Sequence, residues 1–409
     1  MTKNILLLTP IYPAEDIPKT FTPVVHYFAK EWVKLGYNVT VIHFVVNFPK
    51  WINALCKPFS KKIASIIGIP IRTNQLNEKL YHIDNVTVYR IPLKKIRPHS
   101  RYRKEEIDNA FHKSIKFLNE INFTPDCIIG HWVNPQIEFI AKFKTIYNVP
   151  SALVLHDNGQ DFKTIYRKDA ERLFSSIDLI GFRSIPLRKE FEQTFKLNKI
   201  YFNCFSGIPS ELIVSSPSRD FSSIKSFLFV GTLYKRKYPS IIITAVDTVF
   251  KNNDYKITFI GTGEEYKKIQ SYAKKLHKEK QIQLLGRKNR TEVSQQMLKH
   301  DIFIMISKNE AFGLVYLEAM ASGCITIASR NEGFDGIIID GENGFLCEAG
   351  NSEELSHIIR KILSLPKSEL QRISHNAINT AQNMTDTIVA QKYINTIKEY
   401  KETNSHVSI

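Results

Sequence analysis

Short apolar runs alternate with helix-forming stretches along this chain, and the alternation occurs in two successive cycles. The runs of the first cycle lie at residues 5–9, 39–42, 86–91, 126–130 and 151–155. Those of the second cycle lie at residues 226–231, 256–260, 281–285, 301–306 and 324–328. Continuous apolar strands separated by helices are typical of a parallel sheet that helices cover on both faces. The alternation therefore predicts an α/β protein with two doubly wound domains.

The length of 409 residues suits two domains of roughly 200 residues each. Residues 206–223 are rich in Ser and Pro and have few apolar anchors, which is typical of a linker. We therefore predict one domain at residues 1–205 and a second at 206–380, facing each other across a cleft where ligands bind outside the strand ends. Residues 381–409 contain a final helix with a single apolar stripe, which could pack on either domain.

No feature of a membrane-spanning or secreted chain stands out. No apolar run reaches the ~18 residues that a spanning helix needs. The N-terminus passes directly into the first apolar run, without the basic leader and cleavage site of a secretory signal. No two of the five cysteines lie close in sequence, and none has a histidine at metal-ligand spacing. These observations predict free thiols and a cytoplasmic location.

The formal net charge of +16 is unevenly distributed. Residues 51–104 contain twelve Lys or Arg and two acids, whereas residues 301–350 contain two Lys or Arg and eight acids. A basic surface attracts polyanions, so nucleic acid, anionic lipid and phosphorylated substrates are all candidate partners.

An anion site is expected where the apolar strand at 302–306 leads into a loop and a short helix. The backbone N–H groups of Phe312, Gly313 and Leu314 would be unpaired donors at the start of that helix. The helix dipole adds to them, and Gly313 allows a close approach of the backbone to a diphosphate.

Two acids, Glu310 and Glu318, flank this start. Carboxylates repel phosphate, so we expect them to accept hydrogen bonds from the hydroxyls of a sugar and a ribose. In isolation, the simpler interpretation would be a helix-start acid and a surface charge.

The strand at 302–306 is followed in order by Glu310, Phe312-Gly313-Leu314, residues 318–323 and residues 340–346. This order closely resembles the donor-site signature of glycosyltransferase family 4 in the GT-B superfamily. The resemblance implies a GT-B fold with two Rossmann-like domains. It also implies a retaining hexosyltransferase that uses a nucleotide-sugar donor, with Glu310 among its catalytic residues.

The resemblance extends to the cations of the second domain. Residues 229–237 are similar to the first strand and loop of the family's C-terminal domain, which implies that Lys237 binds the donor diphosphate. The family often has Arg directly after the glycine, where this chain has Thr232, and Arg236 is our suggested substitute. Such cations would neutralise the departing diphosphate. The backbone near Arg287 is expected to meet the base.

Three residues of the first domain follow the same resemblance. His156 follows the run at 151–155 and resembles the family's histidine beside the anomeric centre, where it would contact the transferred sugar and hold it in a reactive pose. His131 and Trp132 follow the run at 126–130 and are expected to face the acceptor.

The chain also departs from the family pattern. Residues 14–22 lack the Gly-Gly pair of many members, and Gly336 stands where the family usually has Glu, with Asp335 beside it. No Asp-x-Asp motif is present, so we expect neither a metal nor another cofactor. No carboxylate suits the role of a nucleophile, which favours front-face substitution over a covalent intermediate.

Residues 51–67 have large apolar side chains at a spacing of four with lysines beside them, a pattern of a basic amphipathic segment at a membrane interface. The same pattern alone also fits a helix that packs in the core. The charge of residues 51–104 favours an anionic membrane. We therefore predict peripheral association with the inner face of the plasma membrane, a lipid-linked saccharide acceptor, and a role in surface polysaccharide biosynthesis.

Two other functions fit part of the pattern. A nucleic-acid-binding protein would explain the charge, but not the two acids and Lys237, and no nucleic-acid-binding signature is present. We therefore expect no nucleic-acid partner. A nucleotide-sugar epimerase of the same fold would explain the donor site without needing an acceptor.

Overall fold

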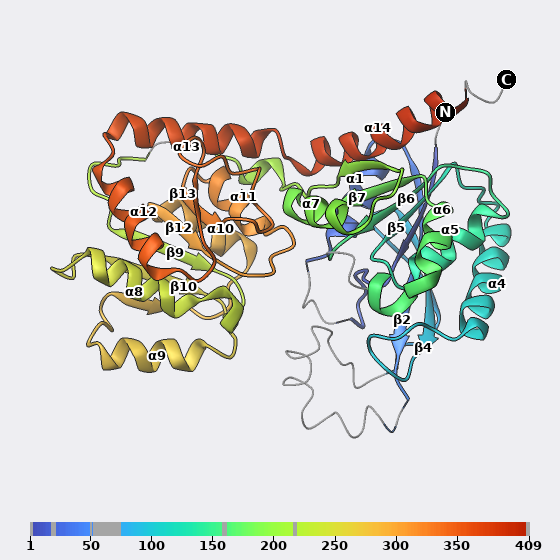
Figure 1. The fold of residues 1–409 in the computed structure, drawn as a ribbon, viewed down its shortest axis with the longest axis horizontal. Helices are drawn as coiled ribbons and strands as arrows, with labels where there is room; N and C mark the ends of the chain where they lie inside the picture. The colour runs from blue at the N-terminus through green and yellow to red at the C-terminus, as the bar shows by residue number, and fades with distance from the viewer. Residues whose placement is uncertain are drawn as a thin grey trace. The chain divides into compact units, whose positions relative to one another are not determined.

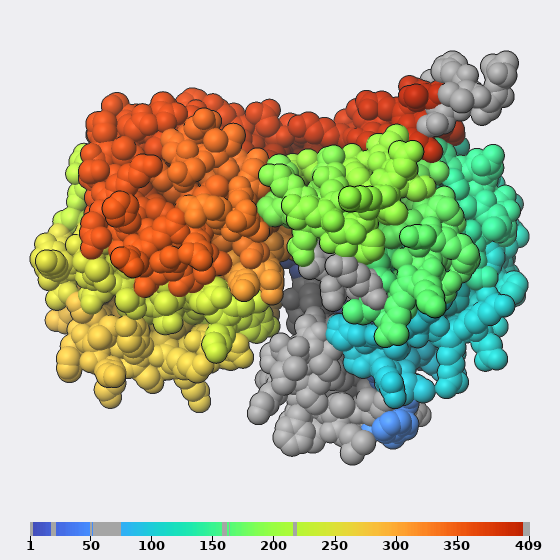
Figure 2. Space-filling model, in the orientation of Figure 1, coloured from blue at the N-terminus to red at the C-terminus, as the bar shows by residue number. Residues whose placement is uncertain are grey.

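The computed structural model describes residues 3–17, 22–49, 51, 75–157, 162–215 and 219–405. The chain divides into two compact units (Figures 1 and 2). Unit 1 comprises Met1–Phe182, Phe191–Cys204 and Ala390–Ile409. Unit 2 comprises Arg183–Glu190 and Phe205–Val389. Compared with the ranges expected from the sequence, unit 2 also contains residues 183–190, 205 and 381–389, and the end of the final helix belongs to unit 1.

Unit 1 contains an eight-stranded sheet with the order β3-β4-β2-β1-β5-β6-β7-β8. Its strands are β1 (Asn4–Thr9), β2 (Asn38–Asn47), β3 (Lys79–Ile83), β4 (Val86–Lys94), β5 (Cys127–His131), β6 (Ser151–Leu155), β7 (Leu179–Phe182) and β8 (Ile200–Asn203). All neighbours are parallel except β3, which pairs antiparallel with β4 at the sheet edge. The carboxyl ends of β4, β2, β1, β5 and β6 therefore lie along one edge of the sheet.

The helices of unit 1 connect these strands (Figure 1). They are α1 (Val24–Lys34), α4 (Lys104–Glu120), α5 (Gln136–Lys144), α6 (Ala170–Ser175) and the second part of α7 (Ile185–Thr194). The last helix, α14 (Asp386–Ser405), begins in unit 2 and ends in unit 1. In unit 1 the indole Nε1 of Trp32 donates to the carbonyl oxygen of Ala390 at 2.9 Å, and Tyr393 packs edge-on against Phe28 and Trp32.

Unit 2 contains a parallel six-stranded sheet with the order β11-β10-β9-β12-β13-β14. Its strands are β9 (Ser226–Val230), β10 (Lys256–Ile260), β11 (Ile282–Leu284), β12 (Ile302–Met305), β13 (Ile325–Ser329) and β14 (Phe345–Cys347). Its further helices are α8 (Pro239–Val249), α9 (Tyr266–Lys275), α10 (Arg290–Lys299), α11 (Leu314–Ala321), α12 (Ser352–Ser364) and α13 (Lys367–Gln382). They pack in two groups, α8 with α9 and α12, and α10 with α11 and α13.

Most strands in the middle of both sheets are wholly buried, which explains why they appear in the sequence as continuous apolar runs. Each unit therefore has its own apolar core. Of the five cysteines, those at 127, 204, 324 and 347 are buried free thiols, and Cys56 lies outside the described residues. In the described ranges, no helix is both long and apolar enough to cross a bilayer.

Candidate functional site

The start of helix α11 is the centre of the candidate site in unit 2. Gly313 is its N-cap and has a φ of +88°, a left-handed conformation that glycine adopts readily. Within the described part of the chain, the backbone N–H groups of Phe312, Gly313 and Leu314 donate no hydrogen bond to the protein. Unpaired donors and the positive end of a helix dipole together favour an anion. The structure thus brings together the three N–H groups that the sequence assigned to an anion site.

The side chain of Phe312 anchors this segment in the core of unit 2. Its ring stacks on Phe205 with centroids 5.9 Å apart and meets Phe334 edge-on at 5.3 Å. The guanidinium of Arg183 lies 5.4 Å from the ring centroid. Since the ring is buried on all sides, Phe312 contributes its backbone to the site, held in a fixed place by these contacts.

Glu310 is held at the mouth of the same loop, with 15% of its side chain exposed. Its Oε2 lies 3.4 Å from Nζ of Lys237 and accepts a hydrogen bond from Oγ of Ser307 at 3.3 Å. Its backbone N–H donates to Oε2 of Glu332 at 2.8 Å. The carboxylate of Glu310 is therefore oriented by groups from two segments of unit 2, and Glu332 holds its backbone from a third.

The cations come from a short 3-10 turn after β9, Lys235–Lys237. The side chain of Lys237 is only 12% exposed, so its ammonium group sits in a partly desolvated position. Nη1 of Arg236 lies 3.7 Å from Oε2 of Glu310 and donates to the carbonyl oxygens of Lys308 and Asn309 at 2.9 and 3.2 Å. Arg236 thus ties the turn to the loop of Glu310, in addition to adding positive charge.

Three further residues of unit 2, Thr232, Arg287 and Asp335, were considered from the sequence for the donor site. Within the described residues, neither Thr232 nor Asp335 forms a side-chain hydrogen bond or ion pair with Glu310 or Lys237. Thr232 and Arg287 are exposed, the latter in the loop between β11 and α10. Asp335 accepts a hydrogen bond from the backbone N–H of Asn331 at 2.6 Å, within its own turn. One oxygen of its carboxylate is therefore engaged within its own turn.

Glu318 lies in the second turn of α11 and is 16% exposed. Nε of Arg290 donates to its Oε1 at 2.8 Å, and Nη2 of Arg290 lies at the same distance from that oxygen. Arg290 is the first residue of α10, whose start is fixed by a capping box between Asn289 and Glu292. Burial raises the pKa of Glu318, and the neighbouring guanidinium opposes that shift. Both contacts end on Oε1, so within the described residues Oε2 stays available to a hydroxyl.

Two residues of this site, Arg290 and Glu332, were not expected from the sequence. Each reaches its partner across the fold, Arg290 to Glu318 and Glu332 to the backbone of Glu310. The available signal was the acidic composition of residues 301–350, because a cluster of acids in a folded protein needs nearby cations and N–H donors.

In unit 1, His131 and His156 meet at the carboxyl ends of β5 and β6. Nδ1 of His131 lies 3.0 Å from Nε2 of His156, a hydrogen bond whose direction depends on the tautomers. Trp132, which has a φ of +65°, stacks on His156 with centroids 3.8 Å apart and planes 13° apart. His131 is completely buried and packs against Phe28, so it presents no surface to an acceptor in this conformation.

The loop after β1 is fixed to unit 1 by polar contacts. The guanidinium of Arg90, on β4, makes two hydrogen bonds of 2.7 and 2.8 Å to the carboxylate of Asp16. The hydroxyl of Tyr81 donates to the carbonyl oxygen of Pro13 at 3.0 Å. Residues 18–21 of this loop lie outside the described residues.

The basic region at 51–104 is described only in part. The amphipathic segment predicted at 51–67 lies outside the described residues except for Trp51, which is exposed. Two cations of the basic region at 51–104 are neutralised by carboxylates inside unit 1. Arg90 is buried against Asp16, and Arg101 forms ion pairs with Glu138 and Asp169. The charge that this region can offer to a membrane is therefore smaller than the sequence count suggested.

Over the described ranges, no three His, Cys, Asp or Glu side chains come together as ligands for a metal ion. The expectations that the protein needs neither a metal nor another cofactor stay predictions.

The chain is similar in sequence to known glycosyltransferases. Residues 218–380 match the family model described as "Glycosyl transferases group 1". The chain is 31% identical over 316 residues to the N-acetyl-alpha-D-glucosaminyl L-malate synthase of Bacillus anthracis, covering 75% of this chain and 80% of that protein. It is also 31% identical over 249 residues to an uncharacterized glycosyltransferase of Methanocaldococcus jannaschii, covering 60% of this chain and 66% of that protein.

Solved structures resemble the whole chain in fold. The crystal structure of Anabaena HepE in complex with UDP has a TM-score of 0.68 at 18% identity, covering 97% of this chain and 100% of that chain. The sucrose-phosphate synthase of Thermosynechococcus elongatus has a TM-score of 0.68 at 14% identity, covering 98% and 100%. At these identities the likeness concerns the fold, which is the GT-B fold with two Rossmann-like units.

Proposed function

The chain belongs to the group 1 glycosyl transferases, and on that premise we propose that it is a retaining enzyme of family 4 type. In this proposal it transfers a hexose-type sugar from a nucleoside-diphosphate donor to a glycan acceptor. One observation carries the proposal: Nζ of Lys237 lies 3.4 Å from the carboxylate of Glu310, beside the unpaired N–H groups that begin α11. A cation and a set of N–H donors suit a diphosphate, and an oriented carboxylate suits a sugar hydroxyl.

Different residues of unit 2 bind different parts of the donor in this proposal. The N–H groups of residues 312–314 and the ammonium of Lys237 hold the diphosphate and stabilise the charge that develops on it. Glu310 accepts a hydrogen bond from the transferred sugar. Oε2 of Glu318 accepts one from the ribose, while Arg290 holds its other oxygen.

The chemical step breaks the bond between the anomeric carbon and the phosphate oxygen. The acceptor hydroxyl forms its bond to the same carbon from the same face, and its proton moves to the departing phosphate oxygen, so configuration is retained. In unit 1, His156 contacts the transferred sugar, and its ring is held by Trp132 and His131. No metal ion takes part in this proposal, and activity that survives a chelator would support that point.

The donor and the acceptor are proposed by class. HepE has been crystallised in complex with UDP and with UDP-glucose, which makes UDP-hexoses the first donors to test. We propose a lipid-linked saccharide as the acceptor, reached at the cytoplasmic face of the plasma membrane during surface polysaccharide synthesis. The likeness to the Bacillus anthracis enzyme supports a second candidate, transfer to L-malate or another small carboxylate.

The experiment has two stages. The first measures the shift in melting temperature of the full chain with UDP-, GDP- and ADP-sugars, because a ligand that binds the folded state raises that temperature. The second follows product formation from the stabilising donor, with and without added acceptor, and determines the anomeric configuration of the product by NMR. Lack of a shift with every nucleotide sugar would refute the donor site. Conversion of the donor sugar to its epimer without acceptor would favour an epimerase, and a product of inverted configuration would exclude retention.

A further inference from the structure

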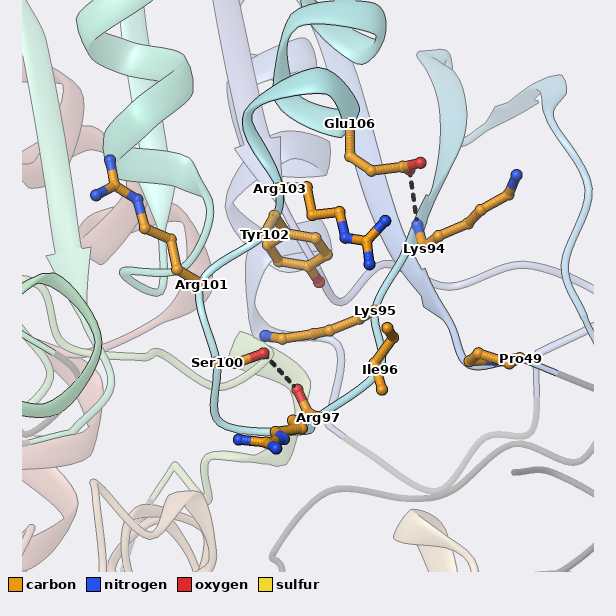
Figure 3. Close-up of a pocket in the computed structure, with 10 residues that line it drawn as sticks. All are labelled: Pro49, Lys94, Lys95, Ile96, Arg97, Ser100, Arg101, Tyr102, Arg103 and Glu106. Atoms are coloured by element: carbon orange, nitrogen blue, oxygen red, sulfur yellow. Dashed lines mark hydrogen bonds between the residues drawn. The ribbon is translucent and has the colours of Figure 1, made fainter. Parts of the chain in front are cut away.

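A basic cavity of about 480 Å³ lies at the carboxyl end of β4, in the loop that leads to α4 (Figure 3). Its volume lies within the range of about 300–1,000 Å³ that is usual for small-molecule sites. Five of its ten lining residues are Lys or Arg, and Glu106 is the one acid among those ten. It is formed entirely by residues of unit 1 and shares no lining residue with the donor site of unit 2.

The cations of the cavity differ in how far their charge is already neutralised. Arg101 forms ion pairs with Glu138 and Asp169, and its side chain points away from the cavity in Figure 3. Arg97 and Arg103 form no ion pair with any carboxylate in the described part of the chain. Two guanidinium groups thus remain without a countercharge, and such groups bind an anion with little competition from the protein.

The loop that carries these arginines is held in place. Glu106 accepts a hydrogen bond from the backbone N–H of Lys94 at 2.9 Å, and the hydroxyl of Ser100 donates to the carbonyl oxygen of Arg97 at 2.8 Å. Nζ of Lys95 lies 4.3 Å from the centre of the Tyr102 ring, beside Arg103 (Figure 3). The cavity is therefore formed before any ligand enters, which lowers the entropic cost of binding.

The position of the cavity connects it with the acceptor residues of unit 1. Because β4 and β5 belong to the parallel part of one sheet, the cavity and Trp132 lie along the same edge. Nδ2 of Asn134 donates to the carbonyl oxygen of Ser100 at 3.0 Å, which joins the cavity loop to the segment after Trp132. A ligand anchored in the cavity can therefore extend along this edge toward Trp132 and His156.

We propose that this cavity binds a phosphoryl group of the acceptor substrate, with Arg97 and Arg103 as its main contacts. The inference rests on the proposed transferase function and adds a chemical class to its acceptor. Guanidinium groups pair with two phosphate oxygens at once, and the rings and alkyl chains of Tyr102 and Ile96 provide apolar surface beside them. The phosphoryl group comes either from a soluble sugar phosphate or diphosphate or from a lipid that carries the glycan.

Binding is tested first without turnover, by modification of arginines with phenylglyoxal followed by mass spectrometry of the full chain. Inorganic pyrophosphate should slow the modification of Arg97 and Arg103 by about tenfold, while Arg360, exposed on α12 in unit 2, should react at an unchanged rate. Vesicles of phosphatidylcholine with phosphatidic acid test the lipid source. Protection by pyrophosphate alone assigns a soluble ligand, and protection by these vesicles assigns a lipid. Absence of protection by both would overturn the proposal, as would equal protection by L-malate.

Variants then connect the cavity with the reaction. The double substitution Arg97→Gln and Arg103→Gln should raise the KM for a phosphorylated acceptor by about tenfold or more, with unchanged acceptor-independent hydrolysis of the donor. Glu106→Gln keeps an acceptor for the N–H of Lys94 but removes a negative charge, so it should tighten pyrophosphate binding about threefold. Arg360→Gln, which removes one exposed cation from unit 2, is the control and should leave this KM unchanged. Wild-type protein that binds no nucleotide sugar would refute the transferase, whereas normal hydrolysis with an unchanged KM in the double variant would refute the cavity alone.

Discussion

Nζ of Lys237 lies 3.4 Å from Oε2 of Glu310, and both side chains are largely buried. This pair joins the turn after β9 to the loop before α11, so that a cation and a carboxylate meet beside the unpaired N–H groups of the helix start. A ligand that brings its own negative charge competes with Glu310 for this ammonium group. Binding of a diphosphate would therefore release the carboxylate toward a sugar hydroxyl.

Replacing this cation tests the assignment directly. We expect Lys237→Gln to lower kcat by about 10²–10³-fold, because the developing charge on the leaving diphosphate loses a buried cation. Lys235→Gln, in the same turn but exposed, is the matched control and should change kcat less than about twofold. Steady-state kinetics with the donor identified by thermal shift provide the measurement. Equal losses in both variants would mean that general positive charge, and not the position of Lys237, is what matters.

The left-handed conformation at Gly313 yields a second prediction. Gly313→Ala should lower the free energy of unfolding by about 1–3 kcal/mol and weaken the thermal shift caused by the donor, because a Cβ there would overlap the ring of Tyr316. Gly341→Ala is the control: its φ is +76°, but no atom lies within 4 Å of the added Cβ. It should cost about 1 kcal/mol through its backbone alone and leave donor binding intact. Chemical denaturation of both variants measures the difference, and equal costs would contradict a steric role for Tyr316.

The fold was predictable where burial determines the sequence pattern. Ten of the fourteen strands in the described residues coincide with predicted apolar runs, because most of the central strands are buried on both sides, and their parallel direction follows from the same pattern. Strands β3, β7, β8 and β14 were missed. Strands β3 and β8 are partly exposed edge strands without a continuous apolar run, and strands β7 and β14 are buried but only four and three residues long. Residues 183–190 belong to unit 2, although the residues before and after them in sequence belong to unit 1. This assignment depends on tertiary packing, which no local pattern encodes.

The same distinction applies to the site. The N–H groups of residues 312–314 and the two acids are neighbours in sequence, and helix geometry alone predicts how they are arranged. Arg290 and Glu332 were not predicted, because they reach the site from segments whose positions are fixed only by the packed sheet and helices of unit 2. The hydrogen bond between His131 and His156 likewise depends on the neighbouring positions of β5 and β6.

The Arg290–Glu318 pair predicts opposite effects of pH on donor affinity and on stability. Because the pKa of Glu318 is raised by burial, donor affinity should fall as the pH decreases through a value above the ordinary 4.5. A raised folded-state pKa contributes stability below the unfolded pKa, and this contribution is lost as the pH rises through the folded pKa. Calorimetric titration of the donor across this range provides the measurement, and Glu318→Gln should remove the pH dependence.

Substitution of the partner tests the same pair. Arg290→Gln should shift the loss of donor affinity to still higher pH, because the guanidinium no longer favours the ionised carboxylate. It should also cost about 1–3 kcal/mol of stability at neutral pH, the usual cost of leaving a buried polar group without its hydrogen-bond partner. Lys288→Gln removes a more exposed ion pair with Glu292 nearby and should cost less than about 0.5 kcal/mol. An unchanged pH profile in Arg290→Gln would contradict the coupling.

The contact between His131 and His156 predicts a positioning role for a residue that is itself fully buried. We expect His131→Leu to lower kcat for transfer by about 10²-fold with little change in donor affinity, because the imidazole of His156 loses the hydrogen bond that orients it. His131→Asn can restore a polar atom near the position of Nδ1 and should recover part of that loss, which a purely structural role would not explain. His112→Ala, on the exposed face of α4, is the control and should behave as wild type. The measurement is kcat together with the donor dissociation constant and the melting temperature of each variant. If Leu and Asn at position 131 reduce kcat equally at equal melting temperatures, the hydrogen bond to His156 is not what supports transfer.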